Sequence, residues 1–294
     1  MSRAKKLNIL IPTIFILFVG AFARHRYIAR QIVLSGNLQD KAMDETSGIA
    51  ASSINKDVYY VHNDSGDNSR FFAISPDGKL ISTLHYKADV IDCEDIAVGP
   101  GPGKKESYVY VGDIGDNYFL RKYITIYRIP ESATWTKGGN IDVTATPINL
   151  KYPDGPKDAE TLMVDPLQKL FYIISKRSDT VSVYTAPLTY KPNDTLVMTH
   201  RAKLFFKGYK PFKWITAGDI SKDGKKVLVK SYEKVYYWKR EGNEPIWRTL
   251  QRTPAEPHYQ QEKQGEAIGF TPDGKGFYTV SEGVFSPIYY YRVP

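Results

Sequence analysis

The chain has 294 residues, of which 42% are hydrophobic and 24% charged, with a formal net charge of +8. These proportions are those of a globular protein and exclude a disordered chain, a collagen-like chain and a polytopic membrane protein. The single cysteine, Cys93, excludes an intramolecular disulfide and a cysteine-based zinc site, whereas 22 tyrosines among many glycines and prolines favour β structure.

The amino terminus carries a targeting segment. Residues 7–23 form an apolar run of 17 residues that follows three basic residues and ends in small ones. This layout is typical of a secretory signal peptide, here cleaved after Ala23. A retained signal anchor is the alternative, because the run lies at the lower limit for crossing a bilayer. Either outcome predicts that the remaining chain is secreted or in the lumen of the secretory pathway, with membrane contact only through residues 7–23.

The charge of the mature chain is modest. Residues 1–23 hold three basic and no acidic side chains, so their removal would leave a net charge of +5. This charge is too small to indicate nucleic-acid binding, and no basic run with interleaved aromatic residues occurs. We therefore expect no nucleic-acid partner and a monomer. Glycosylation sequons at Asn63 and Asn193 are compatible with a glycoprotein of the eukaryotic secretory route.

A pattern of short apolar strands recurs five times along the chain. In the third copy, for example, the strands ETLMVD, LFYIIS and VSVYTA are followed by the β-prone stretch RAKLFF. Corresponding outer strands are KLISTLHY, TPINLKY and PIWRTL in the first, second and fourth copies. Copies that start 47 to 66 residues apart suit the four-stranded blades of a β-propeller. The starts are Ile49, Ile96, Leu162, Ile220 and Ile268.

The fifth copy ends at Pro294 with only three strands. Residues 30–36 (RQIVLSG) are β-prone and have no other partner, so they are expected to supply the missing outer strand and to close the ring. The sequence therefore predicts an all-β protein with a single five-bladed β-propeller at residues 44–294. Residues 24–43 form a lead-in with the ring-closing strand, and residues 1–23 the signal peptide or anchor.

Several stretches resemble known propeller families. The segments DETSGIA, CEDIAVGPGP, GDIGDN, KDAETL and QGEAIGFTPDGK are similar to those of secreted, largely uncharacterised five-bladed propellers, chiefly bacterial. A looser likeness extends to the esterase-like phytase and SdiA-regulated propellers. The resemblance covers residues 44–294 and implies the propeller fold, but it assigns no catalytic residue.

Acidic residues gather where the innermost strands begin. The loops that enter these strands and the loops between second and third strands lie on the same face of a propeller, so their side chains are expected to converge. Two residues before the five repeat starts stand Ser47, Glu94, Glu160, Gly218 and Glu266. Residues at the ends of the second strands are Asp64, Asp113, Lys176, Tyr232 and Glu282. Neighbouring acids are Asp44, Glu45, Asp92, Asp95, Asp158 and Asp219.

A five-residue pattern, D-x-G-D-N, occurs twice, at Asp64–Asn68 and at Asp113–Asn117. It adds Asp67 and Asp116 to the candidate ligands. A sharp turn at the glycine would direct several oxygens to one side, and oxygen ligands suit Ca²⁺. The alternative is that each pattern is an Asx-type turn, and that acids at strand entries accept backbone N–H groups from the adjacent blade.

The leading hypothesis is an enzyme that uses this carboxylate-rich face, with Ca²⁺ as cofactor, to hydrolyse a phosphoester or glycoside. Glu94, Glu160 and Glu266 are the candidate acid or base groups, because crowded carboxylates raise one another's pKa. Lys176 would bind an anionic part of the substrate. The alternative is a non-catalytic propeller that binds a glycan, a peptide or a surface. Completing the candidate set are the substrate contacts His62, His258 and Tyr232, and the metal ligands Asp64, Asp113, Glu282, Asp67 and Asp116.

Overall fold

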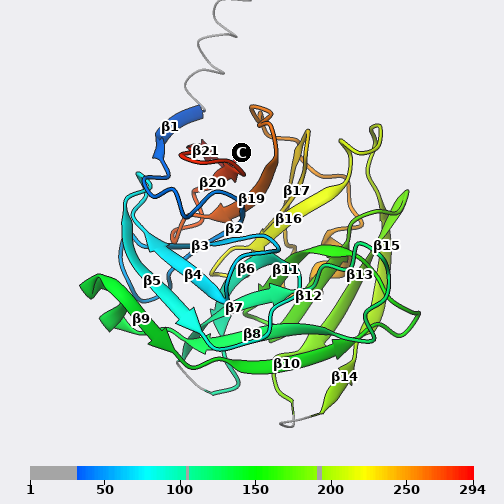
Figure 1. Cartoon of the computed structure of the whole chain (residues 1–294). Helices are drawn as coiled ribbons and strands as arrows, with labels where there is room; N and C mark the ends of the chain where they lie inside the picture. The colour runs from blue at the N-terminus through cyan, green and yellow to red at the C-terminus, as the bar shows by residue number, and fades with distance from the viewer. Residues whose placement is uncertain (1–31, 104–105, 191–193) are drawn as a thin grey trace, which may run out of the picture.

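Five β-sheets surround a central axis (Figure 1) in a computed structural model that describes residues 32–103, 106–190 and 194–294. The first strand of each sheet contacts the first strands of the two neighbouring sheets, and the fifth contacts the first, so that the ring is closed. This is the expected five-bladed propeller. The inner strands are β2 (Thr46–Ala51), β6 (Cys93–Pro100), β11 (Ala159–Asp165), β16 (Ile215–Ile220) and β19 (Gly265–Phe270).

Each inner strand is followed by two antiparallel strands. Their inward side chains pack between neighbouring blades, which gives five apolar clusters around the ring. The second strands are β3 (Tyr59–Asn63), β7 (Ser107–Asp113), β12 (Leu170–Ser175), β17 (Lys226–Ser231) and β20 (Gly276–Ser281). The third strands are β4 (Arg70–Ile74), β8 (Ile124–Pro130), β13 (Thr180–Pro187), β18 (Val235–Lys239) and β21 (Pro287–Arg292).

The outer edges differ from the prediction of four strands in every blade. The predicted outer strands of the first three blades are present as β5 (Leu80–Tyr86), β10 (Thr146–Lys151) and β15 (Thr199–Phe205). Blades one and two each gain a fifth, parallel strand, β9 (Gly139–Val143) and β14 (Thr195–Val197). Each of these strands comes from the next blade along the chain, after the 3₁₀ helix η1 (Ala133–Lys137) in the case of β9. The fifth strands therefore join adjacent blades.

The fourth blade has three strands, so the prediction of an outer strand at PIWRTL is wrong. These residues form the helix α2 (Ile246–Thr249) instead. Ile246, Trp247 and Leu250 all contact the apolar cluster that contains Trp238. A helical turn allows this, whereas a strand would direct the adjacent residues Ile246 and Trp247 to opposite faces. A single bridge between Tyr237 and Ala255 covers the edge of β18.

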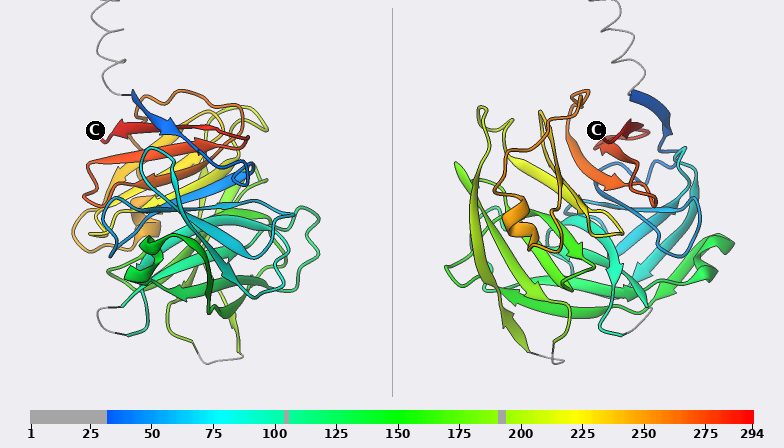
Figure 2. Two further views of the ribbon diagram at one scale, coloured as in Figure 1. Left: turned by 60° about the vertical axis from the view of Figure 1, so that its left-hand side comes forward. Right: turned by 180° about the vertical axis from the view of Figure 1, so that it is seen from behind.

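The ring is closed by the strand β1 (Ile32–Asn37), as expected from the sequence. It pairs antiparallel with β21 from Ile32 beside Tyr291 to Asn37 beside Pro287. The start and the end of the described chain therefore lie side by side in the fifth blade (Figure 2). Arg30, at the start of the predicted strand, lies outside the described residues.

A β-bulge occurs at the same register in all five inner strands. The pairing with the second strand slips by one residue near the start of each inner strand. The bulged residues are Ser47, Glu94, Glu160, Thr216 and Glu266. The expected equivalence of Gly218 with the three glutamates is therefore wrong by two residues, because Thr216 occupies that position. Bulges re-aim side chains and are frequent beside active sites.

Two aspartates, the buried Asp95 and the partly buried Asp219, lock neighbouring blades together. Asp95 accepts hydrogen bonds from its neighbour Ile96 N–H (2.8 Å) and from Leu162 N–H of the third blade (2.8 Å). Asp219 of the fourth blade accepts Phe270 N–H of the fifth (2.8 Å). Burial raises the pKa of Asp95 well above its usual range and that of Asp219 to about 7. For Asp95 and Asp219 this confirms the alternative interpretation, in which acids of the inner strands accept backbone N–H groups from the adjacent blade.

The targeting segment predicted at residues 7–23 lies outside the described residues, as does the sequon residue Asn193. In the part of the chain that the structure describes, no helix combines the length and the hydropathy needed to cross a membrane. The signal peptide or anchor therefore stays a prediction.

We predict that Asp95→Ala destabilises the propeller. The substitution leaves two buried N–H donors without an acceptor, which costs about 1–3 kcal/mol for each. Urea denaturation of the purified protein would measure the loss. Asp142→Ala, at an exposed position of β9, is the control and should change stability by less than about 0.5 kcal/mol. Equal stability of the two variants would contradict the locking role.

Candidate functional site

The bulged residues and the residues that follow the second strands lie around one end of the central axis. In every blade the last residue of the second strand pairs with the residue before the bulge of the inner strand. The residues that directly follow the second strands are therefore equivalent, and they are Asp64, Ile114, Lys176, Tyr232 and Glu282. The expected equivalence therefore holds for Tyr232 and is wrong for Asp113, which pairs with Cys93 one position earlier. These two sets of positions bring together acids from blades that are far apart in sequence.

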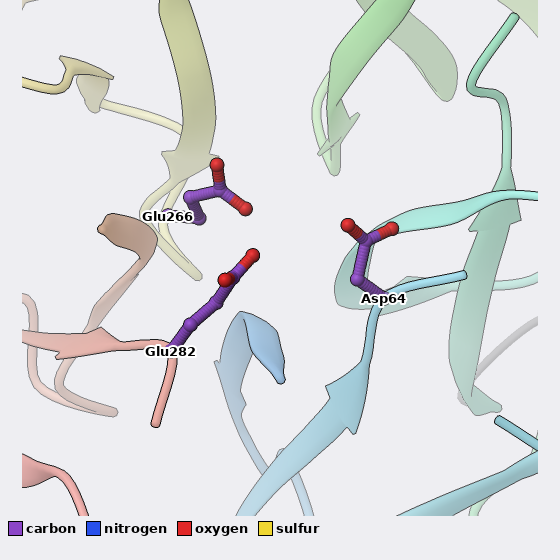
Figure 3. A group of neighbouring side chains, drawn as sticks. All are labelled: Asp64, Glu266 and Glu282. Atoms are coloured by element: carbon purple, nitrogen blue, oxygen red, sulfur yellow. The ribbon is translucent and has the colours of Figure 1, made fainter. Parts of the chain in front are cut away.

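Asp64, Glu266 and Glu282 form the first triad. Their carboxylates point toward one another (Figure 3), and one oxygen of each lies within 4.8 Å of the others. Tyr232 Oη donates to Glu266 Oε1 (2.5 Å), and Gln264 Nε2 donates to Glu282 Oε2 (2.7 Å). These two hydrogen bonds hold the glutamates in place without neutralising them.

Two acids of the first triad, Asp64 and Glu282, have raised pKa values. Burial, opposed by the Ser65 N–H and reinforced by Glu266, raises the pKa of Asp64 to about 7. Burial and the adjacent Glu266 raise the pKa of Glu282 to about 8. Both shifts have the sign expected for buried and crowded carboxylates.

Asp64 also belongs to a second triad, with Asp92 and Glu94. One oxygen of each again lies within 4.8 Å of the others. Burial, reinforced by Asp64, raises the pKa of Glu94 well above its usual range. The backbone of Gly115 lies directly against Asp92 and Glu94, where no Cβ fits. The second triad is therefore enclosed by backbone on one side and shares Asp64 with the first.

Lys176 provides a buried positive charge beside the triads. Its Nζ donates to Glu160 Oε1 and lies 4.0 Å from Glu266 Oε1. The ammonium also lies 5.3 Å from the centroid of the Tyr232 ring. Glu160 Oε2 is buried and has no hydrogen-bond partner within residues 32–103, 106–190 and 194–294. Because Lys176 contacts carboxylates of this chain, its role toward a substrate anion stays a prediction.

Three predicted metal ligands have other partners. Asp113 Oδ1 accepts hydrogen bonds from Arg121 Nη1 (2.7 Å) and Asp92 N–H (2.9 Å). Asp116 accepts the backbone N–H groups of residues 120 and 121 (2.8 and 2.9 Å). Asp67 is paired with Arg70 through both carboxylate oxygens (2.7 and 2.9 Å). The repeated D-x-G-D-N pattern thus forms two turns, of which Asp64 alone enters the triads.

The two candidate histidines, His62 and His258, differ in their surroundings. His62 is buried, its Nδ1 lies 2.7 Å from Asn63 O, and burial lowers its pKa to about 4, so that it is neutral. His258 is exposed in the connection between α2 and β19. Neither makes a hydrogen bond or ion pair with a triad residue in the described part of the chain. Their roles in substrate binding stay predictions.

Asn63, one of the two predicted sequon residues, is hydrogen-bonded inside the fold. It is buried, and its Nδ2 donates to Ala42 O (2.7 Å) and Asp67 Oδ2 (3.0 Å). The amide nitrogen that a glycan would need is therefore used inside the folded protein.

Two acids near the site, Asp92 and Glu262, were not among the predicted site residues. Asp92, two residues before the bulged Glu94, belongs to the second triad. Glu262 is buried and accepts a hydrogen bond from Tyr259 Oη (2.8 Å). It lies next to the fully buried Lys230, whose pKa burial lowers to about 8 against the opposing effects of Glu262 and Glu266. The sequence pattern that could have indicated Asp92 is an acid two residues before the bulged glutamate, which also occurs at Asp158 before Glu160.

No protein-family model matches the chain, and no curated protein does. Among solved structures, the chain is similar to a luciferin-regenerating enzyme, with 12% sequence identity and a TM-score of 0.46 over 86% of this chain and 92% of that chain. A similarity of this size gives no residue of the chain a role. The expected resemblance to secreted propellers is confirmed for the five-bladed fold, and no sequence family is shown.

We predict that the metal-free protein loses stability between pH 6.5 and 8. In this range the unfolded carboxyls are already ionised, whereas folded Asp64 and Glu282, with pKa values of about 7 and 8, still lose protons. A carboxyl group whose pKa is higher in the folded than in the unfolded protein stabilises the folded state at a pH below its unfolded pKa. That stabilisation is lost as the pH rises through the folded pKa. The slope is at most about 1.4 kcal/mol per pH unit for each proton, less for the incompletely buried Glu282.

Denaturant unfolding at several pH values in the presence of a chelator would measure this slope. The double variant Asp64→Asn/Glu282→Gln should reduce this slope, and Asp219, whose pKa is also about 7, accounts for the part that remains. Above pH 8 the loss of the Lys230 proton acts in the opposite direction, so the comparison stops there. A wild-type stability that stays constant or rises over this range would show that these carboxyls are not perturbed.

Proposed function

We propose that the protein is a Ca²⁺-dependent hydrolase that cleaves a small polar phosphoester at the first triad. The observation that carries this proposal is the convergence of Asp64, Glu266 and Glu282 within 4.8 Å of one another. Like charges at such distances repel one another unless protons or a cation intervene. A cation would join three segments that come from the first and fifth blades.

The residues of the first triad fit a hard divalent cation. All three offer carboxylate oxygens, which Ca²⁺ prefers, and three bidentate carboxylates would fill up to six of its six to eight positions. The triad contains no thiolate or imidazole, the ligands that favour zinc or copper. The buried and unpartnered Glu160 Oε2 adds an unused oxygen acceptor beside Lys176.

The chain's own residues divide the work of hydrolysis. Asp64, Glu266 and Glu282 would hold the cation, and Tyr232 orients Glu266 through its hydrogen bond. A bound divalent cation polarises a phosphoryl oxygen and offsets the negative charge of the site. Glu160 is the general base: Lys176 holds one of its oxygens, and the other is free to take a proton from the attacking water.

The spacing of the carboxylates favours a phosphoester over a glycoside. Glycosidases place one carboxyl on each side of the scissile bond, about 5–9.5 Å apart. The triad oxygens instead lie within 4.8 Å of one another and converge on one point. We also propose that this activity lies outside the cytosol, because of the signal sequence at residues 7–23, and that the protein acts as a monomer.

We predict that Ca²⁺ stabilises the chelator-treated protein through Asp64. Binding to the folded state at a hundred times the dissociation constant raises stability by about 2.7 kcal/mol, or roughly 4–5 °C in Tm for a chain of this size. Asp64→Asn should remove this shift, and Asp142→Asn on the exposed surface of β9 should keep it. Thermal unfolding with and without Ca²⁺ provides the measurement.

Glu160→Gln should lower the turnover of a phosphomonoester or phosphodiester by about a hundredfold or more while the Ca²⁺-dependent shift persists. Assays with both substrate classes, and with aryl glycosides as a comparison, would test this. Ca²⁺ stabilisation without turnover of any of these substrates would favour a non-catalytic binding propeller. Absence of both would overturn the proposed function.

A further inference from the structure

We propose that the site holds two divalent cations, with Asp64 bridging them. The inference rests on the proposed function, which requires only the cation at Asp64, Glu266 and Glu282. The second cation would lie at Asp64, Asp92 and Glu94, where the oxygens again converge within 4.8 Å. Asp64 is the residue common to both triads, and its carboxylate has two oxygens with which to face both.

The order of the blades explains why Asp64 can bridge. Glu266 and Glu282 come from β19 and the end of β20 in the fifth blade, whereas Asp92 and Glu94 come from the entry and start of β6 in the second. The first blade contacts both neighbours through β2, and Asp64 directly follows β3 of that blade. Asp64 therefore lies between two carboxylate pairs on neighbouring blades.

Glu94 is the observation that points to a ligand at the second triad. Its side chain occupies the bulge of β6 and is only 2% exposed. In the described residues its carboxylate receives no hydrogen bond and makes no ion pair, although buried carboxylates normally have such partners. Arg121, on the neighbouring turn, is instead paired with Asp113 at 2.7 Å. Glu94 is thus buried with no cation or donor of the chain to satisfy it.

Charge balance also favours two cations over one. Six carboxylates surround the site, and among the described residues Lys176 is the one cationic side chain that forms an ion pair with any of them. One divalent cation would bring the positive charges to three, and two would bring them to five, against six negative charges. The second cation therefore comes closest to neutrality. The six are Asp64, Asp92, Glu94, Glu160, Glu266 and Glu282.

A pair of cations suits the chemistry of a phosphoester. In two-metal sites one cation stabilises the attacking oxygen and the other the leaving oxygen during in-line displacement. The shared Asp64 would keep the two at a constant separation. Glu160, with its unpartnered Oε2, lies outside both triads and remains available as the base.

Calorimetric titration of the chelator-treated protein with CaCl₂ tests the proposal directly. The wild-type protein and the surface control Asp142→Asn should bind two Ca²⁺ per chain. Asp92→Asn and Glu282→Gln should each bind one, because each removes a ligand of one triad, and Asp64→Asn should lose both. With Mn²⁺ in place of Ca²⁺, the electron paramagnetic resonance spectrum should show two coupled ions in the wild type and isolated ions in Asp92→Asn and Glu282→Gln.

The outcomes separate this proposal from the proposed function. One ion per wild-type chain, unchanged in Asp92→Asn, would overturn the second site and leave the first intact. Two ions that persist in Asp92→Asn would also overturn the assignment, because the second ion would lie elsewhere. No bound ion would overturn both proposals. Circular dichroism of each isosteric variant confirms folding, and a misfolded Asp92→Asn is replaced by Glu94→Gln, for which the same loss of one ion is expected.

Discussion

The β-bulge at the start of each inner strand is the constraint on which the site depends. A regular strand alternates its side chains between two faces, so the acids at these positions would otherwise pack between blades. The bulge adds one residue to each inner strand and turns Glu94, Glu160 and Glu266 away from the ladder. Because the fold repeats the bulge in every blade, the three glutamates meet around one axis.

Burial gives the acids of this protein two different roles. Asp95 and Asp219 accept backbone N–H groups of the adjacent blade, and these hydrogen bonds offset the loss of water. Two acids around the site lack comparable donors among the described residues: Glu94 of the second triad has none, and Glu160, outside both triads, keeps one oxygen without a partner. The first set therefore holds the ring together, and the second set has capacity for a cation, a proton or a substrate.

Ion pairs around the rim isolate the triads from their acidic neighbours. Asp113 is paired with Arg121, Asp67 with Arg70 and Asp158 with Arg177. These pairs remove three carboxylates from the candidate site and hold the loops that carry Asp64, Asp92 and Lys176 in place. The central charge is thus concentrated on a few residues, and Lys176 offsets only part of it. A cation-dependent chemistry follows more readily from this distribution than a pair of separate acid and base groups.

The sequence by itself determined the five repeats, the closing strand, which it predicted at residues 30–36, and the acidic character of one end of the propeller. These features are local, because each depends on alternating apolar residues, on turns or on acids next to a strand. The helix at Ile246–Thr249 could not be predicted from the sequence, because the pattern of the six residues PIWRTL fits a short strand and a single helical turn equally well. The tertiary structure alone decided which acids meet. Asp113 stands one residue before the position in its blade that is equivalent to Asp64. Because a strand reverses its side-chain direction at every residue, Asp113 pairs with Arg121 and does not join the triads.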